Sequence, residues 1–154
     1  DDPDMARFAA ETKIPVVLMH KRGNPSTMQR KTDYADPVLE VTDYLQERIA
    51  FAISKGIAKD RIIADPGIGF GKDLAANTAL IRNTAEIREK LGVPILMALS
   101  RKTCIGEMTG RTAEDRLYGT LAADIFSVMH GAFMVRVHDV APCLDTLRVL
   151  KSLV

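Results

Sequence analysis

Four short apolar runs, each followed by a stretch with helical spacing, constrain the fold of this chain more than any other feature. They occupy residues 14–19, 61–65, 93–99 and 132–137. Most of their positions are apolar, which is typical of parallel strands buried on both faces and not of strands with one wet face. The pattern therefore predicts alternating strands and helices built around a parallel sheet.

The segments that flank these runs carry the start and stop signals of helices. We predict helices over five ranges, which are residues 2–12, 37–55, 76–91, 113–130 and 139–150. Gly56, Gly92 and Gly131 directly follow three of them, where helices commonly end. A doubly wound sheet and a (β/α)8 barrel both fit this order. A full barrel takes about 250 residues, so the chain would supply half of one, with no internal domain boundary in residues 1–154.

Polar residues stand where each predicted strand ends. They are His20, Asp65, Lys102, and Arg136 together with His138. The carboxyl ends of parallel strands share one rim, and ligands bind there, so we expect these side chains to converge. One carboxylate, two cations and two imidazoles suit a polar heterocycle that carries an anion. The rim is therefore the candidate site.

Asp65 opens a glycine-rich string, Asp-Pro-Gly-Ile-Gly-Phe-Gly-Lys, over residues 65–72. A Walker loop is excluded, because Pro66 replaces its first glycine and Asp73 replaces the hydroxyl residue after Lys72. A dinucleotide fingerprint is excluded too, because Lys72 occupies the place of its third glycine. A charge after Ile-Ile-Ala is costly without a partner. We therefore interpret Asp65 as a ligand-binding carboxylate, with a simple turn cap as the alternative.

The other charged residues leave more than one interpretation open. Arg136 lies inside a strand pattern, where an arginine usually needs an anion such as a carboxylate or a ligand phosphate. Lys102 could be a solvated loop residue, and His20 and His138 could be structural histidines. The three histidines lack the spacing of metal ligands.

Charge and cysteine usage narrow the class of protein. A net charge of +1 gives no electrostatic case for nucleic acid, and no apolar run approaches the roughly 18 residues that span a bilayer. Cys104 and Cys143 lack a CxxC spacing, so we expect free thiols in a cytoplasmic protein. The chain starts at Asp1 without an initiator methionine, which suggests a piece of a longer protein.

Taken together, several strings resemble the dihydropteroate synthase family of folate biosynthesis. They cover residues 18–29, 65–72, 100–102, 116–123 and 136–140, in the family's order and spacing. The resemblance implies a (β/α)8 TIM barrel, of which this chain supplies about the last four βα units, the C-terminal half. It also implies the condensation of 6-hydroxymethyl-7,8-dihydropterin pyrophosphate with p-aminobenzoate, and a sulfonamide target. A pterin-binding methyltransferase and a non-catalytic pterin-binding paralogue are the alternatives.

The resemblance also assigns expected roles to residues. Asp65 and Lys102 would bind the pterin, Arg136 and His138 would bind the pyrophosphate, and these four residues would form the catalytic set. The residues expected around p-aminobenzoate are Gly23, Asn24, Pro25, Ser26, Thr27, Phe70 and Thr103.

Further expectations concern the cofactor, the partners and the activity of the chain alone. Mg²⁺ would accompany the pyrophosphate, with its ligands largely in the first half of the barrel and none in this chain. The protein would be a homodimer that binds neither nucleic acid nor membrane. The 154 residues alone are expected to be inactive.

Overall fold

The computed structural model describes residues 2, 4–23 and 32–154. Within these residues the strands are β1 (Val16–Met19), β2 (Ile62–Asp65), β3 (Leu96–Met97) and β4 (Met134–Val135). The helices are α1 (Met5–Thr12), α2 (Pro37–Ser54), α3 (Leu74–Arg82), α4 (Thr84–Leu91), α5 (Thr103–Thr109), α6 (Leu117–Met129) and α7 (Val140–Leu153). Two 3-10 turns, η2 (Lys59–Arg61) and η3 (Ala113–Asp115), precede β2 and α6.

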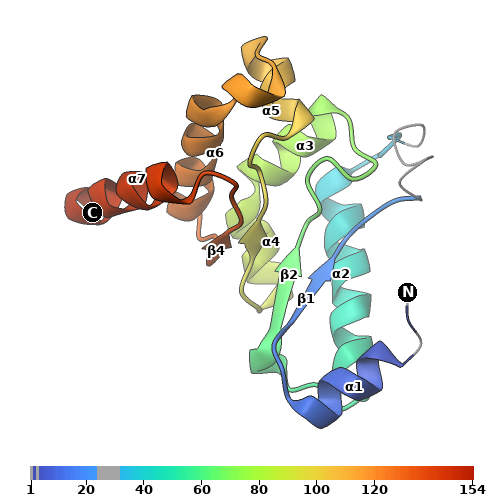
Figure 1. The fold of residues 1–154 in the computed structure, drawn as a ribbon. Coiled ribbons are helices and arrows are strands. Elements are labelled where there is room, and N and C mark those ends of the chain that lie inside the picture. The colour runs from blue at the N-terminus through green and yellow to red at the C-terminus, as the bar shows by residue number, and fades with distance from the viewer. Residues whose placement is uncertain (1, 3, 24–31) are drawn as a thin grey trace.

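The strands are parallel and follow one another in chain order. β1 pairs with β2 from Val16 opposite Ile62 to Met19 opposite Asp65, and β3 pairs with β4. A bridge between Ala64 and Ile95 joins the two pairs, so the order is β1-β2-β3-β4 (Figure 1). The predicted parallel α/β class is confirmed. The arrangement is that of four consecutive βα units of a barrel.

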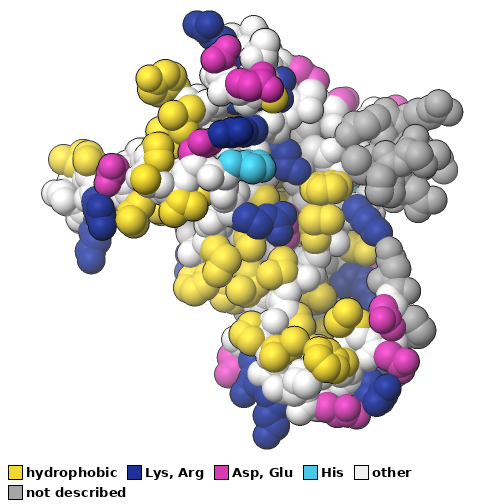
Figure 2. Space-filling model, in the orientation of Figure 1, with side chains coloured by type: hydrophobic (Ala, Val, Ile, Leu, Met, Phe, Trp, Pro, Cys, Tyr) yellow, Lys and Arg dark blue, Asp and Glu magenta, His cyan; other side chains and the backbone are white. Residues whose placement is uncertain are grey.

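Helices α2 and α4 pack behind β1 and β2 in the view of Figure 1, and α1 lies at the end where β1 begins. Large side chains that are fully buried fill the space between strands and helices, among them Leu45, Ile62, Ile87, Ile95 and Met97. Hydrophobic side chains also lie exposed over β1, over α1 and around β4 (Figure 2). Val17 of β1 is 45% exposed and Met134 of β4 is 40% exposed. The two outer strands therefore present apolar edges.

The structure corrects several of the predicted elements. β3 and β4 are much shorter than the runs predicted over residues 93–99 and 132–137, and α1 begins at Met5 instead of residue 2. The helix predicted over 76–91 is two helices, because Asn83 and Thr84 turn side-chain donors onto the backbone at their junction. Asn83 Nδ2 donates to the Ala79 carbonyl and Thr84 Oγ1 to the Ile81 carbonyl, both at 2.8 Å. The helix predicted from residue 113 begins instead at Leu117, after η3, and α5 was not predicted.

No helix among the described residues has the length and apolarity that crossing a bilayer demands.

Candidate active site

Asp65 is the last residue of β2, and its side chain is 1% exposed. Its Oδ1 accepts a hydrogen bond of 2.7 Å from the backbone N–H of Gly67. Its Oδ2 accepts no hydrogen bond from the described residues. Burial raises the pKa of Asp65, and the Gly67 N–H and the charges of Arg136 and Lys102 oppose that rise. The carboxylate thus keeps one oxygen ready for a ligand.

Arg136, just after β4, brings a guanidinium to the unpaired oxygen of Asp65. Its Nη2 lies 3.5 Å from Asp65 Oδ2, and the Arg136 side chain is 57% exposed. This is an ion-pair contact but not a hydrogen bond, so the guanidinium keeps donors for another anion. The two residues come from β2 and β4, with β3 between them. The rim predicted from the strand ends therefore brings Asp65 and Arg136 together.

Lys102 follows β3 and lies over the ring of Phe70. Its Nζ is 4.1 Å from the ring centroid, a cation–π contact that fixes the ammonium beside the glycine-rich turn. Burial lowers the pKa of Lys102, while the charge of Asp65 raises it. Gly69 has φ 83°, a left-handed conformation that glycine adopts without strain, and a Cβ there would also come within 3.3 Å of the Lys102 side chain.

Ser100 links the end of β3 to His138. Its hydroxyl oxygen accepts from the His138 backbone N–H at 3.1 Å and lies 3.0 Å from His138 Nδ1. The imidazole is thereby held by Nδ1, which leaves Nε2 for a ligand. The neighbouring Arg101 donates two hydrogen bonds to the Asp139 carboxylate, at 2.7 and 3.1 Å. This ion pair links the segment after β3 to the segment after β4.

Lys72 is buried beside the glycine-rich turn that follows Asp65. It was not among the predicted site residues. Its side chain is 3% exposed, and its Nζ contacts His20 Nδ1 at 2.8 Å. It also donates to the carbonyls of Gly67 and Phe70, at 2.9 and 3.1 Å. The available signal was its place in the 65–72 string, from which only Asp65 and Phe70 were taken as site residues.

The residues expected around p-aminobenzoate are only partly described. Phe70 is half-buried in the turn, Thr103 is exposed at the start of α5, and Gly23 is exposed beyond β1. Asn24, Pro25, Ser26 and Thr27 lie outside the described residues. Gly23 has φ 76°, a left-handed conformation that glycine adopts without strain.

The described residues do not form a metal site. No group of three or more His, Cys, Asp and Glu side chains among them could hold an ion. Asp65 Oδ2 lies against the Arg136 guanidinium, whose positive charge disfavours a metal ion at that oxygen. The donor set at the rim is cationic around one carboxylate, which suits an anionic ligand better than a bare cation.

A cavity of about 890 Å³ opens at the other end of the strands. It is lined by the segments before β3 and β4, and its side chains include Arg88, Glu89 and Phe133. None of the candidate residues contributes to it. Four βα units supply only part of the wall of a pocket at the rim, so a ligand site there need not form a large cavity in this chain. We therefore locate the candidate site by the side chains at the strand ends.

The sequence of this chain was compared with models of protein families and with curated proteins. The family model described as "Pterin binding enzyme" matches residues 1–138. Dihydropteroate synthase of Escherichia coli (strain K12) is 41% identical over 151 residues, which cover 98% of this chain and 53% of that protein. The chain thus spans about half the length of the curated relatives it matches.

Solved structures agree with the sequence relatives. The Xanthomonas albilineans dihydropteroate synthase in complex with 7,8-dihydropteroate superposes with a TM-score of 0.91 at 42% identity, covering 99% of this chain and 55% of that one. The same enzyme has been solved with 4-aminobenzoic acid, again with a TM-score of 0.91. The Yersinia pestis enzyme with a sulfonamide drug complex gives a TM-score of 0.94 at 33% identity, covering 99% of this chain and 55% of that one.

Proposed function

The chain belongs to the pterin-binding enzyme family, and from that premise we propose that it is the C-terminal half of a dihydropteroate synthase. The full-length protein would condense 6-hydroxymethyl-7,8-dihydropterin pyrophosphate with p-aminobenzoate. The products would be 7,8-dihydropteroate and pyrophosphate. The observation that carries the proposal is the buried carboxylate of Asp65, which has one unpaired oxygen and basic groups beside it.

Asp65 would hold the pterin through the N–H groups of its ring edge. Oδ2 accepts no hydrogen bond from the described residues, and Oδ1 has a second lone pair beyond the one that Gly67 uses, so the carboxylate can accept from two adjacent donors. An ionised Asp65 would also stabilise the positive charge that develops on the pterin. Lys102, whose charge Asp65 supports, would donate to an acceptor of the same ring.

Arg136 and His138 would bind the pyrophosphate. In TIM barrels a phosphate site often follows strands seven and eight, the positions that β3 and β4 would hold here. The amine of p-aminobenzoate attacks the exocyclic carbon, the C–O bond breaks, and its electron pair leaves with the pyrophosphate. The new C–N nitrogen then releases one proton to water. Arg136 and His138 stabilise that leaving charge, so no covalent enzyme nucleophile is needed. Phe70 would supply an apolar wall for p-aminobenzoate, with Thr103 and residues 23–27 nearby.

Mg²⁺ stays a prediction for the full-length protein. The described residues offer it no site, so no step of the mechanism above passes through it. We place its ligands outside this chain, on the pyrophosphate and on the first half of the barrel.

We also propose a cytoplasmic homodimer. Cys104 and Cys143 are free and buried, which fits a reducing compartment. Exposed apolar residues on the last two helices, such as Phe126, Met129 and Val149, would suit a contact with a second copy.

The decisive experiment substitutes Asp65 in the full-length protein. D65N keeps the shape of the side chain but replaces one acceptor by a donor, so kcat/KM for dihydropteroate formation should fall by about 100-fold or more. D60N, at an exposed position in η2, is the matched control. Unchanged kcat/KM in D65N would remove Asp65 from the site, and a wild-type protein that forms no dihydropteroate would refute the proposed activity.

Binding measurements on the full-length wild-type protein distinguish the synthase from the two alternatives. A methyltransferase has no use for a pyrophosphate site at Arg136 and His138, so it should bind pterins without preference for the pyrophosphate ester. A non-catalytic paralogue should bind the ester in calorimetry without releasing pyrophosphate. The exposed guanidinium of Arg136 beside Asp65 favours the synthase over the methyltransferase, and the calorimetry separates the synthase from the paralogue.

A further inference from the structure

Lys72 has a partner for every hydrogen of its ammonium group. Three N–H bonds face three acceptors, which are His20 Nδ1, the Gly67 carbonyl and the Phe70 carbonyl, at 2.8 to 3.1 Å. A buried lysine is costly unless it is satisfied in this way. Burial lowers the pKa of Lys72 to about 7, and the charge of Asp65 opposes that fall. The three acceptors stabilise the charged ammonium, so the group is built into the fold.

His20 is arranged to accept from this ammonium. It is 6% exposed, and its ring packs edge-on to Tyr44 with centroids 4.9 Å apart. Burial, followed by the charges of Lys72 and Arg22, lowers the pKa of His20 to about 3. The imidazole is therefore neutral, and because an ammonium group can only donate, Nδ1 is the acceptor when Lys72 is charged.

The contact joins two segments that both enter the candidate site. His20 follows β1, on the segment that leads to Gly23, while Gly67 and Phe70 belong to the turn after β2. The backbones already approach closely there: His20 N–H donates to the Asp65 carbonyl at 3.0 Å, and a Cβ on Gly67 would clash with the His20 carbonyl oxygen. Lys72 adds side-chain hydrogen bonds to this junction, because its ammonium contacts His20 on one segment and the carbonyls of Gly67 and Phe70 on the other.

We propose that Lys72 is a positioning residue for both substrates, because its ammonium fastens the turn of Gly67 and Phe70 against His20. This inference deepens the proposed function and rests on it. Holding Gly67 in place keeps its N–H on Asp65 Oδ1 and so orients the pterin carboxylate. Holding the Phe70 carbonyl keeps the Phe70 ring under Lys102, at the wall proposed for p-aminobenzoate. Lys72 acts through these groups and touches neither substrate.

The test compares K72M with wild type in the full-length protein. Methionine matches the length of the stem but donates nothing, so KM should rise about tenfold for both substrates, while kcat falls less. K72R keeps the positive charge and the donors and should recover part of that loss. K151M, an exposed lysine of α7, is the control and should change neither KM. A folded K72M protein with both KM values unchanged would overturn the inference.

A second measurement covers the case in which K72M folds poorly. H20F removes one acceptor and leaves Lys72 in place, so it should also raise both KM values. Nitrogen-15 NMR of His20 in wild type should show Nδ1 as a hydrogen-bonded acceptor and Nε2 as the protonated nitrogen. A protonated Nδ1 would contradict the contact. This readout needs no catalysis, so an inactive wild-type protein would refute the proposed activity and still leave the junction open to test.

Discussion

The guanidinium of Arg136 lies 3.5 Å from Oδ2 of Asp65, so the residue proposed to hold pyrophosphate touches the residue proposed to hold the pterin. Asp65 is 1% exposed, whereas Arg136 is half-exposed and reaches inward from the rim. The two proposed subsites are therefore electrostatically coupled. The positive charge of Arg136 favours the ionised form of a carboxyl group that burial alone would make more basic.

The first prediction follows from that coupling. Burial raises the pKa of Asp65 and Arg136 lowers it, so R136M should raise that pKa further. Because an ionised Asp65 is required, the acidic limb of the pH profile of kcat/KM should move to higher pH in R136M. R148M, whose arginine pairs with Asp145 on the surface of α7, is the control and should leave the limb in place. An unmoved limb in R136M would show that the two subsites are not coupled.

The second prediction concerns Ser100, which holds His138 through two contacts to one hydroxyl. S100A should release the imidazole and raise KM for the pterin pyrophosphate by roughly 2- to 12-fold, the range of one ordinary hydrogen bond. KM for p-aminobenzoate should change less, since His138 is assigned to the pyrophosphate. S152A removes an exposed hydroxyl in α7 and serves as the control. If S100A affects both substrates equally, Ser100 supports the fold and not His138.

Features of the fold that leave a continuous pattern in the sequence could be predicted, whereas features set by individual side-chain contacts could not. The strands were predictable because their apolar runs are continuous, and the convergence of Asp65 and Arg136 followed from parallel pairing. The break at Asn83 was not predictable, because the helical spacing continues across it and the interruption comes from side-chain donors. α5 was missed because a seven-residue helix with a glycine inside has little periodicity to detect.

Lys72 shows the same limit within the site. In the sequence it follows a glycine-rich turn and precedes Asp73, which is the setting of a solvated lysine. Its burial depends on His20, 52 residues earlier, and on two carbonyls of its own turn. Such a group becomes visible only when the ends of β1 and β2 are placed side by side.

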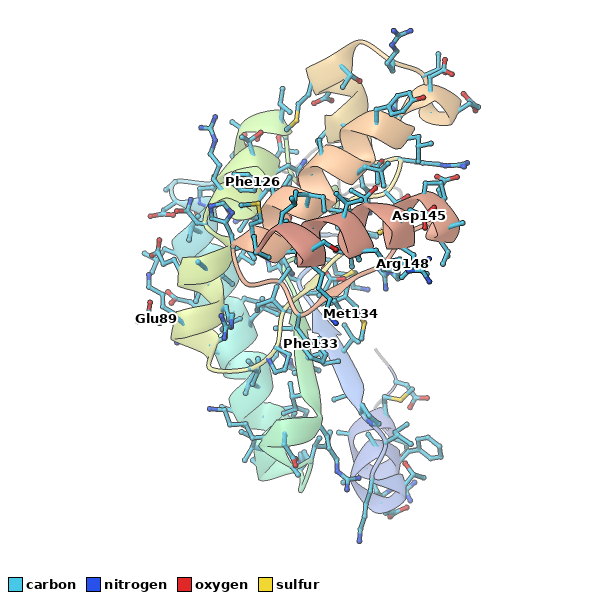
Figure 3. All side chains as sticks on the ribbon, turned by 90° about the vertical axis from the view of Figure 1, so that its left-hand side faces the viewer. Glu89, Phe126, Phe133, Met134, Asp145 and Arg148 are labelled. Carbon is cyan, nitrogen blue, oxygen red and sulfur yellow. The ribbon has the colours of Figure 1, made fainter. Side chains whose placement is uncertain are left out.

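The third prediction concerns the outer strands. Val17 of β1 and Met134 of β4 are exposed, and Phe133 is 67% exposed. Figure 3 shows Phe133 and Met134 next to each other at β4. In a closed barrel the first half would cover these edges, so the isolated chain should self-associate in sedimentation velocity and lack activity. The double variant V17K/M134K should shift the chain toward monomer, whereas L39K, at an exposed position of α2, should not. A wild-type chain that stays monomeric at all concentrations would contradict the prediction.

The last prediction concerns Asp124 in α6, which is 1% exposed and whose two carboxylate oxygens meet no hydrogen-bond donor among the described residues. Burial raises the pKa of Asp124 from 3.8 to about 7. Between these values the folded state binds the proton that the unfolded state releases, so stability should fall as pH rises from 4 to 7. The Cys143 thiol of α7 also feels this charge, because burial and Asp124 together raise the pKa of Cys143.

D124A should remove this dependence and stabilise the full-length protein at pH 8 by on the order of 2 kcal/mol, since alanine also favours the helix. Urea midpoints at pH 5 and pH 8 measure the effect, with D145A, at an exposed position of α7, as the control. At pH 5 the gain should be small, because folded Asp124 is then protonated and its charge is not buried. Equal gains for D124A at both pH values would show that the carboxyl group does not titrate between them, and that packing alone accounts for its effect.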